Sequence, residues 1–469
     1  MKIISAMFTF LCLGSVMQSQ TIEGNWEGTL EAPGVKLKIV FHITTDGKTY
    51  RATMDSPDQG AMGIPVTETN FTDEKLSLKI ANLGASYEGQ LDPSSEAIKG
   101  VFKQGPAVIP LNLTKVEGET SKPNRSQVPQ PPFPYQEEMV QYENTQAEGV
   151  TLAGTLTLPK GEGPHPVVIL ISGSGPQNRD EELLGHKPFL VIADHLTRQG
   201  IAVLRYDDRG VAKSTGDFSK ATSADFATDV EAGIAYLKTR DDIDKKKIGL
   251  IGHSEGGLIA PMVAAKSKDV AFIVLMAGPG VTGKEILLLQ QDLIAKANGV
   301  DPDILAISRK INQKTYDLIE EHGDQVQVIK SELMAYAEQE MSRLSVENQE
   351  ALKQNLASLD QSLQIVTSPW FRYFLSYDPA VALQKTKCPV LAINGEKDLQ
   401  VDADQNLPAI EAALKKGGNK HYSIKRLSNH NHLFQTSTSG NPTEYAQITE
   451  TVSPTALKAM TDWLQTQIK

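Results

Sequence analysis

The pattern of hydrophobic and polar positions changes once along the 469-residue chain. In the first part apolar and polar residues alternate, as in Val35–Phe41 and Leu76–Ile80, so successive side chains point to opposite faces of a strand. Asp-Gly, Asp-Pro and Gly-Pro pairs separate about seven such short runs as turns. Residues 20–118 are therefore predicted to form a small antiparallel all-β domain, either a barrel or a sandwich.

After this domain, residues 119–134 are rich in proline and predict an extended linker. All the candidate chemical groups lie beyond this linker, which is expected to give few contacts between the two domains, so a chain that starts near Pro134 should keep its chemistry. From there on, strands apolar enough to be buried on both faces, such as Val167–Ile171, alternate with amphipathic helices, such as Asp225–Arg240. Residues 135–469 are predicted to form an α/β domain with a doubly wound, mostly parallel sheet.

The alternation stops at residues 282–368, which carry no strand signal. Their apolar residues recur at helical spacing, so this stretch predicts a helical insertion. A lid over the site is the favoured interpretation, and a coiled appendage or a dimer contact is the alternative. The aromatic run Pro369–Phe374 follows the insertion, and its rings either line a pocket or pack in the core.

The N-terminus has the features of a signal peptide. Lys2 gives a positive start, and the apolar stretch Ile3–Leu13 is too short to span a bilayer. Residues 1–19 are therefore predicted to be a cleaved signal peptide, with a buried strand as the alternative. The prediction implies export to the periplasm or the extracellular space, and no later stretch predicts a membrane span.

Composition narrows the possible partners. The formal net charge of −11 argues against a nucleic-acid or anionic-membrane surface. The chain has two cysteines, and no Cys/His spacing resembles a zinc site. No metal and no cofactor are predicted, and a small molecule is the expected partner.

A candidate nucleophile lies between a strand and a helix. Ile248–Ile251 suits a buried strand, Leu258–Ala265 suits a helix, and the pattern Gly-x-Ser-x-Gly lies between them with Ser254 at its centre. A serine on such a sharp turn points away from the sheet, and the glycines allow the strand and helix to cross closely. The alternative is a glycine-rich turn with an idle serine.

A serine needs a base and the base needs an orienting acid. Asp398 follows the strand that ends at Ile393, where a tight turn returns an acid to the active edge of the sheet. Glu396 and Asp402 compete for this role. After the last strand, either His430 or His432 could be the base, and the order Ser, Asp, His suits this architecture.

An oxyanion needs two backbone N–H donors. One is expected from Glu255, which directly follows the serine. The other is expected from the loop after Ile171, at Ser174 or Gly173, where glycines allow a close approach to the substrate.

From about Tyr135 to Lys469 the chain resembles the α/β-hydrolase superfamily, and more closely the EstD-like bacterial serine carboxylesterases and S33-peptidase-like hydrolases. The resemblance implies Ser254, Asp398 and His432 as a triad, because the family histidine directly precedes a Leu-Phe pair. It rests on five motifs: Ser172–Pro176, Leu204–Gly210, Gly252–Gly257, Asn394–Asp398 and Asn431–Phe434. In the second motif, Asp208 and Arg209 are interpreted as a structural ion pair. At the start of the β-domain, Gly24–Trp26 resembles the Gly-x-Trp of lipocalin-like barrels.

Together these features predict an exported serine hydrolase that cleaves carboxylic esters of short to medium acyl chains through an acyl-enzyme. One alternative is a serine aminopeptidase or other amidase on the same triad. Another is a ligand-binding protein with a degenerate hydrolase scaffold, which predicts the loss of a triad residue, and none is lost. Whether the β-domain binds a ligand or a surface, or only packs, stays open, as does the oligomeric state.

Overall fold

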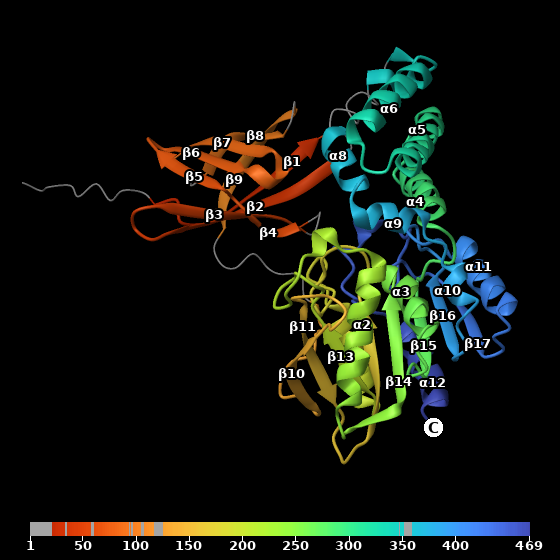
Figure 1. The fold of residues 1–469 in the computed structure, drawn as a ribbon. Coiled ribbons are helices and arrows are strands. Elements are labelled where there is room, and N and C mark those ends of the chain that lie inside the picture. The colour runs from red at the N-terminus through yellow and green to blue at the C-terminus, as the bar shows by residue number, and fades with distance from the viewer. Residues whose placement is uncertain are drawn as a thin grey trace, which may run out of the picture. The chain divides into compact units, whose positions relative to one another are not determined.

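A computed structural model describes residues 21–32, 35–57, 61–92, 94, 97–104, 107–116, 125–346, 348–350 and 359–469. The predicted signal peptide, residues 1–19, lies outside the described residues, and so does the linker up to residue 124. The chain divides into two compact units, Met1–Lys122 and Pro123–Lys469 (Figure 1).

The first unit is one curled antiparallel sheet of nine strands in the order β4-β3-β2-β1-β9-β8-β7-β6-β5. The predicted all-β domain is confirmed, with a single sheet where a sandwich would need two. Alternate residues of each strand face inward, as Leu76, Leu78 and Ile80 do in β6, and they pack around Trp26 and Tyr87. The strands are β1 Gly24–Ala32, β2 Val35–Thr45, β3 Tyr50–Ser56, β4 Ala61–Pro65, β5 Glu68–Thr72, β6 Lys75–Ile80, β7 Ala85–Asp92, β8 Ala97–Gln104 and β9 Ala107–Val116.

The second unit is built on an eight-stranded sheet in the order β10-β11-β13-β12-β14-β15-β16-β17. The pairs β10–β11 and β11–β13 are antiparallel and the pairs from β12 onward are parallel, which confirms the predicted mostly parallel sheet. The strands are β10 Gln136–Glu143, β11 Thr151–Leu158, β12 His165–Ile171, β13 Ala202–Tyr206, β14 Ile243–His253, β15 Phe272–Met276, β16 Val390–Gly395 and β17 Tyr422–Leu427.

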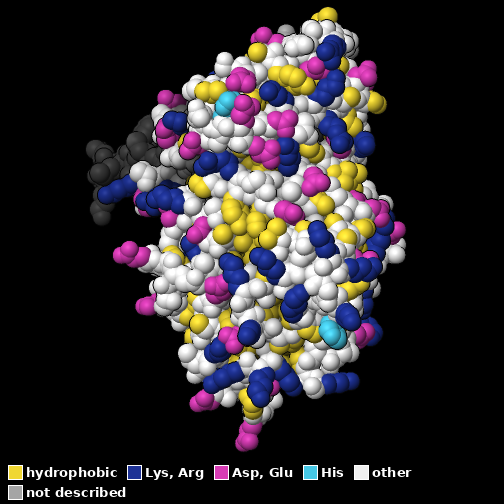
Figure 2. Space-filling model, turned by 45° about the vertical axis from the view of Figure 1, so that its right-hand side comes forward, with side chains coloured by type: hydrophobic (Ala, Val, Ile, Leu, Met, Phe, Trp, Pro, Cys, Tyr) yellow, Lys and Arg dark blue, Asp and Glu magenta, His cyan; other side chains and the backbone are white. Residues whose placement is uncertain are grey.

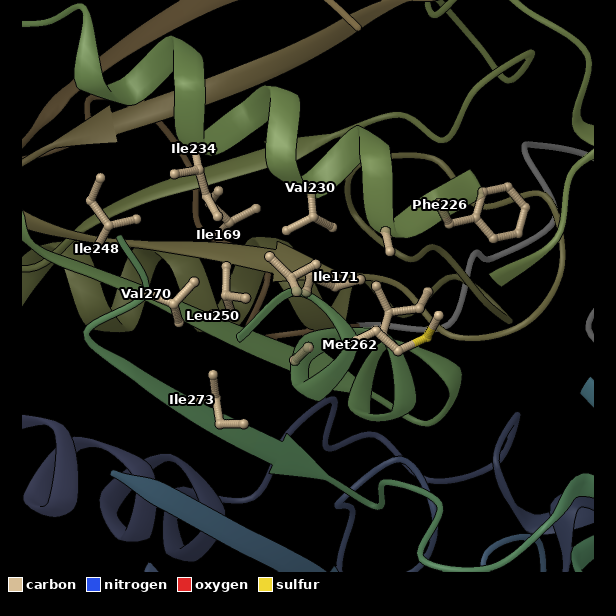
Figure 3. Packing of buried hydrophobic residues seen from close by; sticks show 14 of the residues in the cluster. Ile169, Ile171, Phe226, Val230, Ile234, Ile248, Leu250, Met262, Val270 and Ile273 are labelled. Atoms are coloured by element: carbon tan, nitrogen blue, oxygen red, sulfur yellow. The ribbon is translucent and has the colours of Figure 1, made fainter. Parts of the chain in front are cut away.

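Helices cover both faces of this sheet, as expected for a doubly wound α/β fold. One face packs against α2 Ser223–Lys238, α3 Glu255–Ala264, α10 Ala380–Leu383 and α11 Ala403–Lys416. The other packs against α1 Pro188–Arg198 and α12 Pro454–Gln467. Figure 3 shows Val230 and Ile234 of α2 packed over Ile169 and Leu250 of the central strands, so the strand that leads to Ser254 lies in the rigid core.

The insertion is helical, as predicted, and has a hydrophobic core of its own that includes Ile311, Leu333 and Phe371. Its helices are α4 Gly283–Ala297, α5 Pro302–His322, α6 Val326–Met341 and α8 Leu359–Val366, and α9 Pro369–Ser376 follows. Within the described residues, no helix combines the length and the apolar character needed to cross a bilayer. On the face shown in Figure 2, acidic and basic side chains are intermixed, so this face presents no extended patch of a single charge sign.

Candidate active site

Ser254 occupies the turn between β14 and α3 with φ 51° and ψ −117°, a backbone conformation that non-glycine residues rarely adopt. Two glycines make this turn sterically possible. A Cβ on Gly252 would lie 2.0 Å from the Gly256 carbonyl oxygen, and one on Gly256 would lie 2.1 Å from the Ile171 carbonyl oxygen. Close packing of this turn against β12 thus keeps Ser254 in its strained backbone conformation at the edge of the sheet.

The candidate acid and base contact each other. His432 Nδ1 donates to Asp398 Oδ2 at 2.8 Å, and both residues are buried. Asp398 Oδ1 accepts the N–H groups of Gln400 at 2.8 Å and Val401 at 2.9 Å, so the carboxylate is fixed from both sides. His432 and Ser254 line the same cavity, although no hydrogen bond joins the two side chains within the described residues. Such bonds often tighten only when substrate binds.

The competing residues are engaged elsewhere. His430 donates from Nδ1 to the Ser428 carbonyl at 2.7 Å, and its Nε2 lies 2.5 Å from Ser453 Oγ. Glu396 accepts the Asn429 N–H at 3.1 Å, and Asp402 caps α11. The arrangement therefore favours Asp398 and His432 over the other candidates.

Residues 172–177, called the oxyanion loop below, contain the two amides expected as alternative oxyanion donors, and the expectation for Gly173 is corrected. The Gly173 N–H donates to Glu181 Oε1 at 2.7 Å, so this amide is occupied and is not a free oxyanion donor. The N–H groups of Ser174 and Glu255 have no backbone acceptor in the described part of the chain. These two amides, on the loop and at the start of α3, are the pair available to a developing oxyanion.

Sequence reasoning missed the role of Glu181 and His253. His253 Nδ1 lies 2.9 Å from Glu181 Oε1, and His253 Nε2 lies 3.0 Å from the His432 carbonyl oxygen. Burial acts to lower the pKa of His253, but Glu181, the His432 carbonyl and Asp398 together outweigh it, so the pKa is raised. No local pattern marks Glu181, which lies in the charged run Arg179–Glu182.

The predicted Asp208–Arg209 pair is wrong. Arg209 instead donates to Asp229 at 2.7 Å. Asp208 accepts from Ser172 Oγ at 2.7 Å and from the Gln177 N–H at 2.9 Å, so it holds the two ends of the oxyanion loop. Burial, reinforced by nearby carboxyl groups, raises the pKa of Asp208 to about 8.

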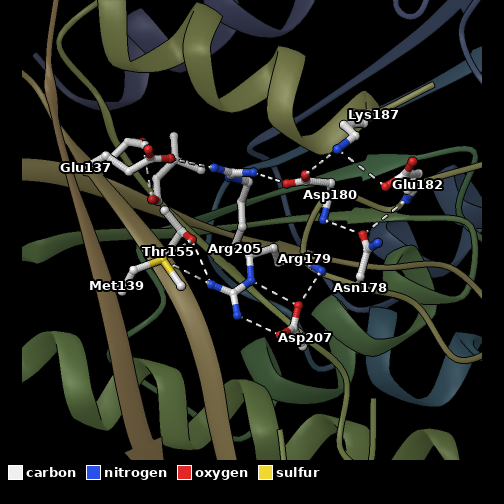
Figure 4. Close-up of polar contacts among 12 residues, drawn as sticks. Glu137, Met139, Thr155, Asn178, Arg179, Asp180, Glu182, Lys187, Arg205 and Asp207 are labelled. Atoms are coloured by element: carbon white, nitrogen blue, oxygen red, sulfur yellow. Dashed lines mark hydrogen bonds and ion pairs between the residues drawn. The ribbon is translucent and has the colours of Figure 1, made fainter. Parts of the chain in front are cut away.

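The segment after the oxyanion loop is anchored by the half-buried Arg179 and the buried Arg205 (Figure 4). Arg179 pairs with Asp207 at 2.6 Å, and Arg205 lies between Asp180 and Glu137. These pairs link the segment to strands β10 and β13 and fix where Glu181 is presented.

The cavity beside Ser254 has a volume of about 310 Å³. Its lining is mostly apolar, and Glu181 is the one acid among the described residues that form it. Trp370 and Phe374 of α9 line it as a stacked pair with ring centroids 5.4 Å apart, whereas Phe371 packs in the core of the insertion. The Trp370 indole donates to the Glu255 carboxylate at 2.8 Å, which ties α9 to the residue after Ser254.

The cavity wall formed by Leu183, His186 and Thr451 is held by the predicted linker. Arg125 donates to the Leu184 carbonyl at 2.9 Å, to the Ala446 carbonyl at 2.8 Å and to the Ile448 carbonyl. Gln127 accepts the Thr451 N–H at 2.5 Å and donates to the Val452 carbonyl at 2.7 Å. This part of the predicted linker therefore belongs to the second unit, and a chain that starts near Pro134 would lose these contacts.

Residues that could bind a metal are not clustered: within the described residues, no three His, Cys, Asp or Glu side chains gather in a way that could hold an ion.

Comparison with known proteins gives a family and several relatives. Residues 148–432 match the family described as X-Pro dipeptidyl-peptidase (S15 family). The chain is 34% identical to esterase EstD of Thermotoga maritima over 136 residues, which are 29% of this chain and 32% of that protein. An uncharacterized 31.7 kDa protein of Escherichia coli is 23% identical over 59% of this chain and 86% of its own length. The solved structure of the α/β hydrolase GrgF from Penicillium aligns with a TM-score of 0.43 at 18% identity, over 71% of this chain and 99% of that chain.

Proposed function

The chain belongs to the X-Pro dipeptidyl-peptidase (S15) family, and from this premise we propose that it is a serine hydrolase acting on carboxylic esters of short to medium acyl chains. The observation that carries the proposal is the Asp398–His432 pair, which opens onto the same small apolar cavity as the strained Ser254. The alignment with EstD covers about a third of that esterase, so its activity serves here as support for the proposal.

The proposed mechanism follows from the roles of these groups. Ser254 Oγ attacks the ester carbonyl carbon while His432 Nε2 takes the hydroxyl proton, and Asp398 orients the ring and stabilises the imidazolium. The amides of Glu255 and Ser174 donate to the negative oxygen of the tetrahedral intermediate. The C–O bond then breaks, and the alcohol leaves with the proton from His432. Water attacks the acyl-enzyme by the same route and releases the acid and free Ser254.

The cavity favours an ester over a peptide with a free N-terminus. A substrate ammonium needs a carboxylate partner, and the one acid of the described lining, Glu181, is already engaged by the His253 ring and the Gly173 N–H. An alkoxide also leaves more readily than an amine and demands less of the general acid. The small volume and the Trp370–Phe374 pair fit a short, uncharged acyl group.

The second candidate is a peptidase or amidase on the same residues, and the name of the matching family favours it. A ligand-binding protein with a degenerate scaffold is the third possibility, and the complete Asp398–His432 pair beside Ser254 argues against it. The sequence-based expectation of export to the periplasm or the extracellular space is part of the proposal, and cell fractionation tests it.

Steady-state kinetics on one preparation decide between these candidates. We expect kcat/KM for p-nitrophenyl butyrate to exceed that for the decanoate and for alanine and X-Pro arylamides. Ser254→Ala serves as the blank for every substrate. A higher kcat/KM for an arylamide would assign the site to peptides, and no turnover of any substrate would support the binding-protein alternative.

A further inference from the structure

The contacts of Glu181 and His253 indicate the protonation state of the His253 ring. Glu181 Oε1 accepts the Gly173 N–H at 2.7 Å and faces His253 Nδ1 at 2.9 Å. On the other side of the ring, His253 Nε2 faces the His432 carbonyl oxygen at 3.0 Å. A carboxylate and a carbonyl can only accept hydrogen bonds, so each ring nitrogen must carry a proton.

We infer that His253 is an imidazolium, that it forms a buried ion pair with the Glu181 carboxylate, and that this pair positions the machinery of the proposed hydrolase. Both residues are 6% exposed. A buried pair of charges is tolerated when its hydrogen-bonding groups are satisfied, and here both ring N–H groups have acceptors and the carboxylate also receives a backbone amide. The charge state is inferred from these contacts alone, whereas its effect on catalysis rests on the proposed function.

The pair joins three segments whose relative positions the reaction depends on. His253 directly precedes Ser254, Gly173 directly precedes Ser174, and the carbonyl that His253 holds belongs to His432. The rings of His253 and His432 lie with centroids 4.9 Å apart. A shift of either charged side chain would therefore move the oxyanion amide relative to the nucleophile and the base.

The backbone of Glu181 supports a positioning role. Its φ is 50°, in the left-handed region that a non-glycine residue occupies only when its surroundings impose it. Two ion pairs hold the residues just before Glu181 and supply that constraint (Figure 4). Arg179 pairs with Asp207, and Asp180 pairs with Arg205. We take Glu181 and His253 as positioning residues, acting through Ser174, Ser254 and His432.

The charge state is tested on the full-length protein labelled with ¹⁵N-histidine. Two-dimensional ¹H–¹⁵N spectra at pH 8 should show the His253 ring with both nitrogens protonated, as the signal that His253→Gln removes. The ring of His42 also faces two oxygen acceptors, so the assignment rests on that loss. Glu181→Gln should convert the same histidine to a neutral tautomer, whereas the control Glu182→Gln, at an exposed acid on the neighbouring position, should leave it unchanged. A wild-type His253 with one unprotonated nitrogen would overturn the inference. This readout does not depend on activity, so its failure is distinct from failure of the proposed function.

Kinetics test the positioning role. Glu181→Gln and His253→Gln should each lower kcat for p-nitrophenyl butyrate about 100-fold with KM changed less than about threefold, because a displaced oxyanion donor costs on the order of 10²–10³ in kcat. Glu182→Gln should match the wild type in both constants. Unchanged kcat in a folded Glu181→Gln variant, or a loss expressed in KM alone, would refute the positioning role.

Discussion

Arg125 is the most informative residue to change outside the triad. It lies in a segment whose composition predicts a linker, yet its guanidinium donates to three backbone carbonyls, those of Leu184, Ala446 and Ile448. These carbonyls belong to the two loops that form one wall of the cavity. Arg125→Ala in the full chain removes all three hydrogen bonds without touching a residue of the proposed mechanism.

The magnitude follows from these contacts. A hydrogen bond from a charged group contributes about 1.5–3 kcal/mol, but the burial that lowers the pKa of Arg125 offsets part of the sum. Water can also reach some of the freed carbonyls, so we expect a net loss of about 2–4 kcal/mol in the free energy that keeps residues 445–452 closed. Bound substrate must then restore part of that order, and 1.4 kcal/mol corresponds to a tenfold change in affinity. KM should rise about tenfold, with kcat within about threefold.

Two measurements check this prediction. Hydrogen exchange should show faster opening of residues 445–452 in Arg125→Ala, and steady-state kinetics should show the rise in KM. Arg125→Lys should restore part of the effect, and Arg198→Ala, which removes an exposed arginine paired with Asp194, should change neither. If exchange and KM both stay at wild-type values, the segment is a passive connector and the argument from its contacts fails.

The remaining predictions concern the site itself. Ser254→Ala should lower kcat on the order of a millionfold and abolish labelling by a fluorophosphonate, and labelling of another serine in an active variant would contradict the assignment. His432→Ala should match it while His430→Ala keeps most activity, and the reverse result would place the base two residues away. The folded chain retains the Asp208 proton up to about pH 8, whereas the unfolded chain loses it near pH 4, so the free energy of unfolding should fall as pH rises across this window. Asp208→Asn should remove a slope of up to about 1.4 kcal/mol per pH unit in urea titrations, and equal slopes would refute the raised pKa. Trp370→Ala should enlarge the cavity and raise the octanoate-to-butyrate ratio of kcat/KM about tenfold, and an unchanged ratio would mean that the acyl group lies elsewhere.

The fold was largely predictable because its signals are local. The alternation of apolar and polar residues predicted the β-domain. The strands that are apolar on both faces predicted a sheet covered by helices on both sides. The glycines around Ser254 indicated a turn too tight for side chains, and the distances that a Cβ would meet there agree with that reasoning. The sheet has nine strands where about seven were predicted, and it is single where the pattern left a sandwich open, because the period does not reveal how strands pair.

The identities of the candidate nucleophile and acid were predictable because their order along the chain is typical of this fold. Nucleophile, acid and base occur in the order that this architecture requires, although the residues alone left His430 and His432 open. The structure separates them through partners far away in sequence: His432 meets Asp398, and His430 meets Ser453.

By itself, the sequence determined the two-part organisation, the parallel sheet, the helical insertion and the strained serine, since each depends on residues close together in the chain. The tertiary structure decided which amides are free, because the Gly173 N–H is taken by Glu181 through a contact that no local pattern records. It also decided that Arg125 holds a wall of the cavity through a carbonyl 323 residues away. Hydrophobic period reports which face of an element is buried, whereas the partner of a buried polar group depends on how distant segments meet in space.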